Sequence, residues 1–574
     1  MTGGKALVIG DDTRSFLAIV RSLGRAGITI HAAPTNFRSP ALRSRYIAAI
    51  HDLPPWMGDG AEWLAAVSEL LSVQRYDLVI PCNETALLPL QRHSAALSHL
   101  ARVAIPHDRA IAVLFDKLET RELAERVGVR VAAGRLLSPH DTAEALLAEF
   151  GSPLVLKPRR SYSLEQLAAR GKVEVIKEQA RLGRLLGTLD PDETIVESYF
   201  PGQGVGISLL AAGGRVLQAF EHHRVREIAG ESFYRCSGPL SPDLLSACEA
   251  IVAGSDYTGV AMFEFKKKPS GEWIFLEVNA RPWGSMPLPV ALGVDFPYRW
   301  YRLLTAAEEG PAVPYRTGVY GRNLLPDLHV CLRQAEARRL GSVATAWLIA
   351  RWAAEMSRIL IGKEVHDVLV HDDARPGLIE LYDIALAVRR AIERRSPGAA
   401  ARRRRRARLQ LKSLRRTIGI PHIVFVCQGN ICRSPFAEAL LRARLGDSGV
   451  MISSAGMMPR PGRPTPTFGR EAASEHGLDL SAHRSVWLGR NTVETASLII
   501  VFDELTRSGV FDRYPDITAP VILLGDLLEL GDITDPIDGG AAEFRRVYDQ
   551  IAACVSELLP RLNGLAAKQP GSPM

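Results

Sequence analysis

Two thiols and one guanidinium lie within the short stretch VFVCQGNICRSP, positions 424–435. Cys427 ends an apolar, strand-like run, turn-forming residues follow it, and helical periodicity begins at Pro435. A strand, a tight loop and a helix start surround a small cavity with backbone N–H groups, which bind an oxyanion and favour a thiolate. Arg433 can close over the anion with its planar fork. The spacing predicts a nucleophilic cysteine beneath a bound phosphate.

The full string, with ISSAG (452–456), GLDLSAHRS (477–485), LIIVFDE (498–504) and DITDPIDGG (532–540), resembles the low-molecular-weight protein tyrosine phosphatases over about residues 420–565. The resemblance implies that Cys427 is the nucleophile, Arg433 the phosphate clamp and Asp535 the general acid. It implies a supporting phosphate-loop network of Gly429, Asn430, Ser434 and His483. The implied substrate is a phosphotyrosyl protein or another phosphomonoester, and this chemistry needs no cofactor.

Several positions bear on specificity and redox behaviour. Ile537 and Asp538 follow the Asp-Pro pair, where tyrosine-specific relatives often carry aromatic residues, so phosphate chemistry is better supported than phosphotyrosine preference. Ile431 is the residue type of the tyrosine-specific branch rather than of the arginine-phosphatase branch. Cys432 has two readings, a redox partner that forms a reversible disulfide with the nucleophile and a small buried side chain.

A second candidate site lies in GVAMFEFKKKPSGEWIFLEVNAR, residues 259–281, which is typical of a β-hairpin turning at 269–272. Symmetric pairing about that turn places Glu264 opposite Glu277, and alternation puts Glu277, Asn279 and Arg281 on one face. Opposed like charges destabilise a hairpin unless a cation lies between them. Carboxylate and amide oxygens suit Mg²⁺, so we expect a metal site of Glu264, Glu277 and Asn279, with a solvated sheet face as the alternative.

This hairpin and the segments before it resemble the ATP-grasp superfamily, notably its carboxylate–amine ligase and carbamoyl-phosphate-synthase-like members, over about residues 5–320. The resemblance implies ATP and Mg²⁺ as cofactors. It implies phosphate contacts from Lys117 and Lys157, and an adenine contact from Glu197. Arg281 is the expected contact for a carboxylate or acyl phosphate, and Arg235 is a weaker candidate. The loop after Lys157 lacks the usual glycines, so Arg159 and Arg160 are candidate phosphate contacts there. The carboxylate and amine substrates are unknown.

The elements that position these residues are those of an α/β protein. The strand-like runs within 5–12, 28–33, 76–82 and 101–106 alternate with helical patterns, which predicts a doubly wound start. We expect an ATP-grasp module with a Rossmann-like pre-domain and two α+β lobes, a helical basic linker, and a doubly wound parallel-sheet phosphatase domain. The expected boundaries are 1–110 for the pre-ATP-grasp domain, 111–320 for the ATP-grasp domain, 321–388 for a helical extension, 389–419 for the polybasic linker and 420–565 for the phosphatase domain.

The charge is concentrated in one segment. The chain has a net charge of +7, and residues 389–416 hold thirteen Arg or Lys and one Glu, or +12, which leaves 7 − 12 = −5 for the rest. A solvated linker is one interpretation, and docking on an anionic membrane surface or an acidic partner is the other. The segment carries no aromatic residues for base stacking, which disfavours nucleic acid.

Two features bear on location. Seven scattered cysteines fit a reducing compartment. The most apolar stretch, residues 342–362, contains Arg351, Glu355 and Arg358, so we expect a packed amphipathic helix rather than a membrane span. A cytoplasmic protein is predicted, with peripheral membrane association through residues 389–416 as an open alternative.

The two motif sets together predict a bifunctional protein, an ATP- and Mg-dependent ligase-like module joined to a phosphatase. Two other readings stay open. In one, the ATP-grasp part only senses nucleotide and regulates the phosphatase. In the other, the phosphatase acts on a small-molecule or acyl-phosphate product of the ligase.

Overall fold

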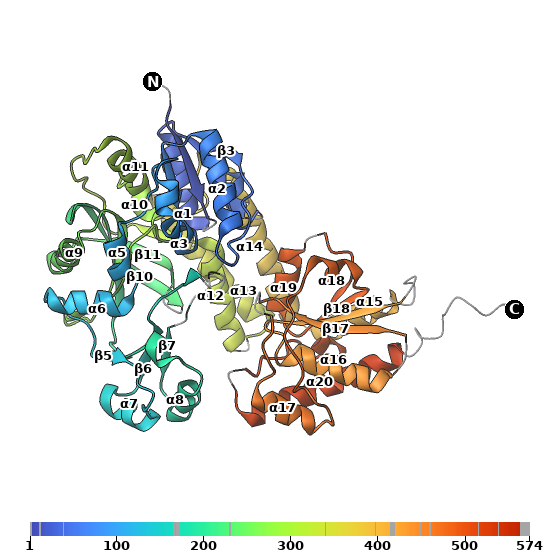
Figure 1. Ribbon diagram of the computed structural model, residues 1–574. Coiled ribbons are helices and arrows are strands. Elements are labelled where there is room, and N and C mark those ends of the chain that lie inside the picture. Colours follow the sequence, from blue (N-terminus) through green and yellow to red (C-terminus); the bar gives the residue numbers. More distant parts are fainter. Residues whose placement is uncertain are drawn as a thin grey trace. The chain divides into compact units, whose positions relative to one another are not determined.

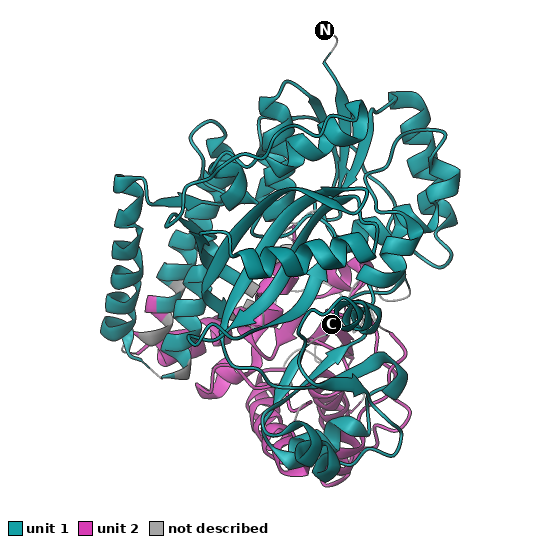
Figure 2. Ribbon diagram, turned by 90° about the vertical axis from the view of Figure 1, so that its left-hand side faces the viewer, with its two compact units in different colours: residues 1–391 teal, residues 392–574 magenta. Residues whose placement is uncertain are grey.

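The computed structural model describes all residues except 1–2, 11–12, 38, 165–166, 168–170, 172, 229–230, 339, 397, 414–419, 447–448, 459–460, 515, 538 and 563–574. The chain forms two compact units, residues 1–391 and residues 392–574, which are coloured separately in Figure 2. We call them the N-terminal unit and the C-terminal unit. Both mix helices with sheets, which confirms the predicted α/β class.

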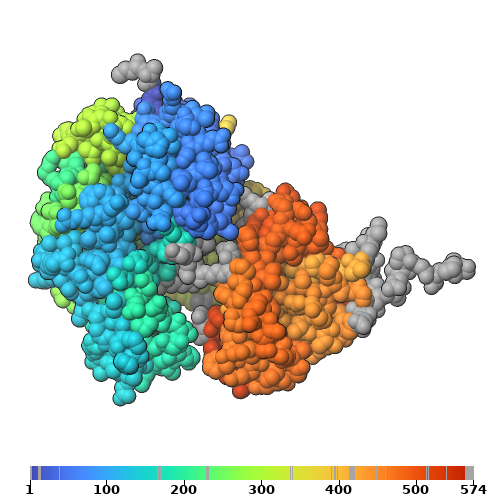
Figure 3. Space-filling view, viewed as in Figure 1, coloured from blue at the N-terminus to red at the C-terminus, as the bar shows by residue number. Residues whose placement is uncertain are grey.

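The N-terminal unit begins with a parallel sheet of four strands in the order β3-β2-β1-β4 (Figure 1). Its strands are β1 (Lys5–Ile9), β2 (Thr29–Ala33), β3 (Ile47–Ile50) and β4 (Leu78–Pro81), flanked by α1 (Thr13–Arg25) and α2 (Ala61–Gln74). Near-continuous apolar runs suit strands covered on both faces. The apolar face of α1 includes Phe16, Val20 and Leu23, all fully buried. In the space-filling view these blue residues gather into one body at the top of the unit (Figure 3).

A smaller antiparallel sheet follows, in the order β5-β8-β6-β7. It consists of β5 (Gly134–Leu136), β6 (Leu154–Pro158), β7 (Glu174–Ile176) and β8 (Thr194–Ser198). The helices α7 (Ala143–Phe150) and α8 (Gln179–Leu186) pack their leucines against it. This lobe carries Lys157 on β6 and Glu197 on β8. In the register of these adjacent strands Lys157 lies opposite Ile195 and Glu197 lies opposite Val155.

The largest sheet has seven strands in the order β13-β12-β9-β10-β11-β14-β15. Its long antiparallel members are β9 (Gln203–Ala212), β10 (Arg215–Ile228), β11 (Glu231–Gly238), β12 (Gly259–Lys267) and β13 (Trp273–Asn279). The region predicted as a helical extension contributes α12 (Leu324–Ala337), α13 (Ser342–Glu355) and α14 (Ala374–Arg395). It also adds β15 (Glu364–His366), which pairs in parallel with β14 (Tyr320–Arg322) and completes the sheet.

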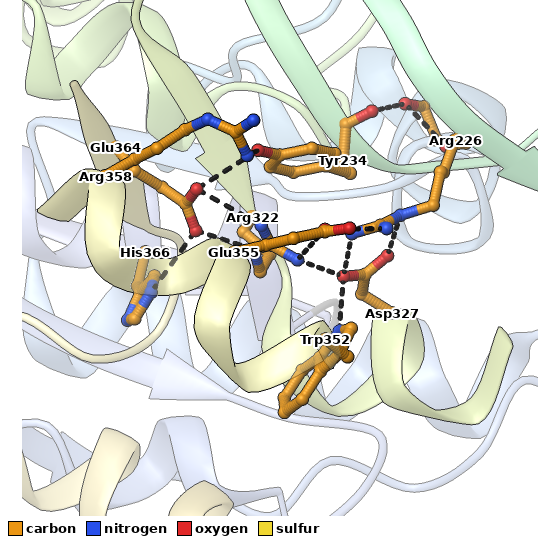
Figure 4. A network of polar contacts seen from close by, with 10 residues as sticks. Arg226, Tyr234, Arg322, Asp327, Trp352, Glu355, Arg358, Glu364 and His366 are labelled. Carbon is orange, nitrogen blue, oxygen red and sulfur yellow. Dashed lines mark hydrogen bonds and ion pairs between the residues drawn. The ribbon is translucent and has the colours of Figure 1, made fainter. Parts of the chain in front are cut away.

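A buried polar network fastens this extension to the sheet (Figure 4). Arg322 on β14 pairs with Asp327 of α12 at 2.7 Å and with Glu364 of β15 at 2.6 Å, and all three side chains are fully buried. Arg226 of β10 reaches Asp327 at 2.8 Å, and the indole of Trp352 donates to the same carboxylate at 2.7 Å. Removing one partner of such a network leaves an uncompensated buried charge, so the extension and sheet are expected to unfold together.

Helix α13 covers most of the apolar stretch 342–362, and the short helix η4 (Met356–Ile361) follows it. Thr345, Ile349 and Trp352 are buried, whereas Val343 and Trp347 are 83% and 65% exposed. Within the described part of the chain, none of the helices has both the length and the apolar character needed to cross a bilayer.

The C-terminal unit contains a parallel sheet of four strands in the order β17-β16-β18-β19. The strands are β16 (His422–Cys427), β17 (Met451–Gly456), β18 (Leu498–Val501) and β19 (Val521–Leu523). One face packs on α16 (Arg433–Leu445), α17 (Thr467–Ser474) and α20 (Ala541–Leu562), and the other on α18 (Arg490–Thr495) and α19 (Glu504–Arg513). Residues of β16 alternate between the two cores, as the period of a strand requires. The predicted doubly wound parallel sheet is confirmed.

Most of the polybasic segment is helical. Residues 389–395 end α14, and α15 (Ala399–Ser413) follows, while 414–416 lie outside the described residues. Ala407 and Leu411 of α15 are 3% and 2% exposed and belong to the main core of the C-terminal unit. The segment that the sequence analysis treats as a linker therefore supplies a packed helix of this unit.

Candidate active sites

Cys427 stands at the carboxyl end of β16, at the base of the loop that leads into α16. Its side chain is 1% exposed. The backbone N–H of Asn430 donates to its Sγ at 3.2 Å, and the Ser434 hydroxyl lies 3.0 Å from the same atom. The Asn430 N–H therefore points at the sulfur, while in the second contact either the thiol or the hydroxyl can be the donor.

Asn430 organises the loop around the thiol. Its φ of 52° lies in the left-handed region, which asparagine tolerates better than most residues. Its Nδ2 donates to Ser434 Oγ at 2.9 Å and to Ser454 Oγ at 2.8 Å, and its Oδ1 accepts from the Val486 N–H at 2.7 Å. His483 Nε2 lies 2.8 Å from its carbonyl oxygen. The structure thus brings together Asn430, Ser434 and His483, the residues expected to support the loop.

Arg433 lies under the same loop and is 1% exposed. Its guanidinium pairs with Asp535 at 2.6 Å and with Asp503 at 2.5 Å, and it donates to the Ile533 carbonyl at 2.9 Å. Burial alone would lower the pKa of Arg433, but the negative charges of Asp535, Cys427 and Asp503 raise it. Cys427 and Arg433 are close in the chain, and the ion pair with Arg433 brings Asp535, more than a hundred residues later, to the same site.

Asp503 is a site residue that the sequence analysis did not single out. It follows β18, the strand beside β16, and caps α19 by accepting from the Thr506 N–H at 2.6 Å. The carboxyl ends of parallel neighbours meet at one edge of a sheet, which brings Asp503 to Arg433. The signal was present in LIIVFDE, where an acidic residue directly follows a buried strand.

Gly429 and Cys432 complete the phosphate loop. A Cβ on Gly429 would lie 3.2 Å from Arg463 Nη2, which itself donates to the Gly429 carbonyl at 2.9 Å. Cys432 is 2% exposed, and burial raises the pKa of its thiol, with the charges of Asp535 and Cys427 adding to the effect. A buried and protonated Cys432 fits the small core side chain as well as a resting redox partner, so both readings remain predictions. On the rim Ile537 is 43% exposed, and Asp538 lies outside the described residues.

The second site is built on the β12–β13 hairpin, where Glu264 pairs with Glu277 as expected. The route to this register differs from the prediction. Between Glu264 and Phe265 a bulge shifts the pairing, and the turn closes with the Lys268 N–H donating to the Glu272 carbonyl. The bulge compensates for the shifted turn, so the two glutamates still face each other.

The expected metal ligands lie together with two arginines. Asn279 Nδ2 donates to Glu264 Oε1 at 3.1 Å, and Arg224 pairs with Glu264 Oε2 at 2.5 Å. Arg281 donates to Asn279 Oδ1 at 2.9 Å and pairs with Glu84 at 3.4 Å. Oxygens of Glu264 and Asn279 therefore accept from the two arginines and from the Asn279 amide, and carboxylate and amide oxygens are also the ligands that Mg²⁺ prefers. Among the described residues no group of three or more His, Cys, Asp or Glu side chains could hold a metal, so this set relies on its asparagine.

The residues expected to bind nucleotide line one cavity. Lys117, Lys157 and Glu197 come from three separate segments and contribute to its wall, together with Glu277, which is an expected metal ligand. Glu197 pairs with Lys157 at 2.7 Å and with Arg121 at 3.2 Å. The cavity holds about 20 Å³, room for about one water molecule, whereas ligand pockets are usually about 300–1,000 Å³. In this conformation the cavity is too small to hold a nucleotide.

Three arginines differ in their placement. Arg235 is fully buried in a two-pronged ion pair with Asp367 at 2.5 and 2.9 Å, and its role as a substrate contact stays a prediction. Arg159 and Arg160 both pair with Asp116, at 2.6 and 3.1 Å. Part of the loop that follows them, at 165–166 and 168–170, lies outside the described residues.

Comparisons with known proteins match both halves of this arrangement. Residues 422–568 match the family model described as low molecular weight phosphotyrosine protein phosphatase. Residues 190–323 match the model described as ATP-grasp in the biosynthetic pathway with Ter operon. Both predicted resemblances are confirmed.

Individual relatives agree with the C-terminal match. The "Probable low molecular weight protein-tyrosine-phosphatase EpsP" of Ralstonia nicotianae is 38% identical over 146 residues, which is 25% of this chain and 99% of the relative. The low molecular weight protein-tyrosine-phosphatase Etp of Escherichia coli K12 is 32% identical over 141 residues, 25% of this chain and 94% of the relative.

Among solved structures, an L-amino acid ligase from Bacillus licheniformis shares 16% identity over 55% of this chain and 78% of its own, with a TM-score of 0.43.

Proposed function

The chain belongs to the low molecular weight phosphotyrosine protein phosphatase family through residues 422–568, and on this basis we propose that its C-terminal unit hydrolyses phosphomonoesters, with phosphotyrosyl protein as the preferred substrate, through a cysteinyl phosphate. One observation carries the proposal. Cys427 Sγ accepts a hydrogen bond from the Asn430 N–H at the base of the loop, and Arg433 of the same loop is held between two carboxylates.

The first step is transfer of the phosphoryl group to sulfur. The Cys427 thiolate attacks phosphorus, a sulfur–phosphorus bond forms, and the bond to the phenolic oxygen breaks. Asp535, as the neutral acid, gives its proton to that oxygen, because a phenol of pKa about 10 leaves slowly as its anion. Arg433 turns from its carboxylate partners to the equatorial phosphate oxygens, which it contacts with two parallel N–H groups.

The second step regenerates the thiolate. Asp535, now ionised, takes a proton from water, and the water oxygen attacks phosphorus. The sulfur–phosphorus bond breaks, inorganic phosphate leaves, and the Asp535 proton is restored for the next cycle. The N–H of Asn430 and the hydroxyl of Ser434 stabilise the leaving thiolate.

The N-terminal unit, we propose, binds ATP with Mg²⁺ and activates a carboxylate as its acyl phosphate for attack by an amine. Four segments supply Lys117, Lys157, Glu197 and Glu277 to one cavity, and this convergence supports the proposal. Mg²⁺ held by Glu264, Glu277 and Asn279 would neutralise phosphate charge. Lys157 and Lys117 would contact phosphate oxygens, and Arg281 would orient the carboxylate.

A second candidate for the N-terminal unit is nucleotide sensing without catalysis. Nucleotide and metal would replace the ion pairs of Glu197 with Lys157 and of Glu264 with Arg224, and such an exchange of contacts is how a nucleotide sensor shifts between two states. ADP release distinguishes the two. A Cys427→Ser protein, which cannot hydrolyse phosphorylated products, is incubated with ATP, Mg²⁺ and pooled carboxylates and amines. ADP formation that depends on the pool supports a ligase, and tight ATP binding with slow, pool-independent hydrolysis supports a sensor.

The two chemistries are also separable by metal removal. EDTA should stop ATP turnover and leave hydrolysis of an aryl phosphate nearly intact, because the loop N–H groups and Arg433 neutralise the phosphate. Loss of both activities would contradict this assignment. An acyl phosphate cleaved much faster than a phosphotyrosyl peptide would instead show that the phosphatase serves a small-molecule product.

A further inference from the structure

Helix α15 presents two faces of different character. The docked face consists of Arg403, Arg404, Ala407, Arg408 and Leu411. Ala407 and Leu411 lie in the core, while Arg403 pairs with Asp526 at 3.0 Å and Arg408 with Glu557 at 2.8 Å. Arg404 lies 3.5 Å from Glu529. Three of the seven basic residues of α15 are therefore neutralised by acidic residues of the same unit.

The opposite side of α15 is basic and exposed. This outer face consists of Arg402, Arg405, Arg406, Leu409 and Lys412, whose spacing of three and four residues places them along one side of a helix. All five are exposed, and Leu409 is 56% exposed in the middle of the row. Within the described part of the chain, Arg405 and Arg406 meet no acidic partner.

We propose that the outer face of α15 is a docking surface for anionic lipid bilayers. The helix is fixed to a folded unit by its docked face, so the outer face presents a straight row of positive charge about 15 Å long, from a rise of about 1.5 Å per residue. A bilayer offers a flat and continuous negative surface to such a row. Leu409 adds an apolar side chain at the place where an interfacial helix enters the headgroup boundary.

The arrangement fits nucleic acid less well. The outer face holds no aromatic side chain for base stacking, and the docked face prevents the helix from projecting into a groove. Each basic residue near an anionic membrane strengthens binding about fivefold, so four of them give a gain of several hundredfold. Binding of this size is reversible and depends strongly on salt.

The test uses the full chain and vesicles of phosphatidylserine with phosphatidylcholine, with pure phosphatidylcholine vesicles as the control. The first variant, Arg405→Gln/Arg406→Gln/Lys412→Gln, removes three charges from the outer face. The matched variant, Arg403→Gln/Arg404→Gln/Arg408→Gln, removes the same charge from the docked face. Glutamine keeps a good helix propensity at each position.

We expect cosedimentation with the anionic vesicles at low salt and its loss at 1 M salt, where the Debye length is about 3 Å. The outer-face variant should bind about a hundredfold more weakly, while its hydrolysis of nitrophenyl phosphate stays unchanged and shows that the unit is folded. The matched variant should lose less than about fivefold in its affinity for the anionic vesicles. Leu409→Ala should weaken binding without changing its salt dependence.

Three outcomes would overturn the proposal. One is that the full chain fails to bind anionic vesicles at low salt. Another is that the two triple variants lose binding equally, which would mean that the segment acts as an unstructured cloud of charge. The third is that duplex DNA or an acidic polypeptide binds with a similar salt dependence while the vesicles do not.

Discussion

Asp535 and Asp503 make a matched pair for testing the general acid, because both carboxylates pair with Arg433, at 2.6 and 2.5 Å. Asp535→Asn removes the proton donor but keeps an oxygen that can accept from Arg433. Asp503→Asn makes the same change of charge against the same guanidinium. It also preserves the start of α19, since asparagine caps a helix about as well as aspartate.

The expected magnitudes differ between the two variants. A general acid contributes about 10²- to 10⁴-fold, or about 3–5 kcal/mol, when the leaving group needs a proton. Asp535→Asn should therefore lower kcat/KM for a phosphotyrosyl peptide by that factor, and far less for nitrophenyl phosphate, whose phenolate leaves unaided. Asp503→Asn replaces an ion pair with a hydrogen bond from Arg433 to a neutral acceptor, a loss of about 1 kcal/mol, so both substrates should slow by the same factor of about tenfold or less.

The assay is kcat/KM for a series of aryl phosphates, because this constant reports only the steps up to release of the phenol. The logarithm of the rate is plotted against the pKa of the leaving phenol for each protein. Asp535→Asn should make the slope of this plot steeper than that of the wild type, and Asp503→Asn should leave the slope unchanged. If Asp503→Asn steepens it instead, Asp503 is the acid. If neither does, proton donation by these carboxylates is the wrong mechanism.

Three further predictions concern single substitutions. Glu277→Gln should lower ATP turnover, because it removes one carboxylate of the opposed pair, and it should leave nitrophenyl phosphate hydrolysis unchanged. A several-fold loss of phosphatase activity in a folded protein would mean that the two sites are coupled. Leu411→Ala should destabilise the C-terminal unit by about 2–5 kcal/mol, because the side chain is 2% exposed in the core. The measurement is urea unfolding with phosphatase activity as the readout, and an effect near zero would show that α15 does not pack on the core. Burial, with the charges of Asp367 and Asp383 adding to it, raises the pKa of Glu380 from 4.5 to about 7, so the folded N-terminal unit binds this proton more tightly than the unfolded chain and loses stability as the pH rises from 4.5 to 7. Glu380→Gln should therefore be more stable than the wild type at pH 8, by up to about 3 kcal/mol in urea unfolding, and the advantage should disappear near pH 4; a constant difference across this range would refute it.

The phosphatase site was predictable because most of it is local. Cys427, Asn430, Arg433 and Ser434 lie within eight residues, so a strand, a loop and a helix start fix their geometry. Asp503 was missed because its contact with Arg433 depends on the order of strands in the sheet, in which β16 lies beside β18. That order is a property of the whole fold and leaves only a weak trace in the local sequence.

The ATP-grasp site shows where local patterns fail. Alternation along β13 correctly grouped Glu277, Asn279 and Arg281, but a bulge cannot be read from a hairpin sequence, and the register was right only because the bulge offset a shifted turn. The ion pair that buries Arg235 was not predictable for another reason. Its partner Asp367 belongs to the extension after β14, whose contribution to the sheet has no pattern near Arg235.

The packing of the polybasic segment was not predicted, because its many arginines obscured the two apolar positions that face the core. Ala407 and Leu411 are four residues apart, the spacing of one helical face, but arginines surround them. Long arginine side chains can pass beside an apolar surface while their guanidinium groups reach acidic partners, so a strongly basic helix can still pack on a core. Asp526, Glu529 and Glu557, which receive those groups, lie more than a hundred residues later in the chain.

Trapping the phosphoenzyme tests the central claim most directly. Full-length Asp535→Asn is mixed with radiolabelled nitrophenyl phosphate and quenched in acid, because loss of the base that activates water should let the cysteinyl phosphate accumulate. The account predicts one burst of nitrophenolate per chain and one labelled phosphoryl group on Cys427, located by peptide mass spectrometry, with no label in the Asp535→Asn protein that also carries Cys427→Ser. Label on another residue, or label that persists without Cys427, would contradict it.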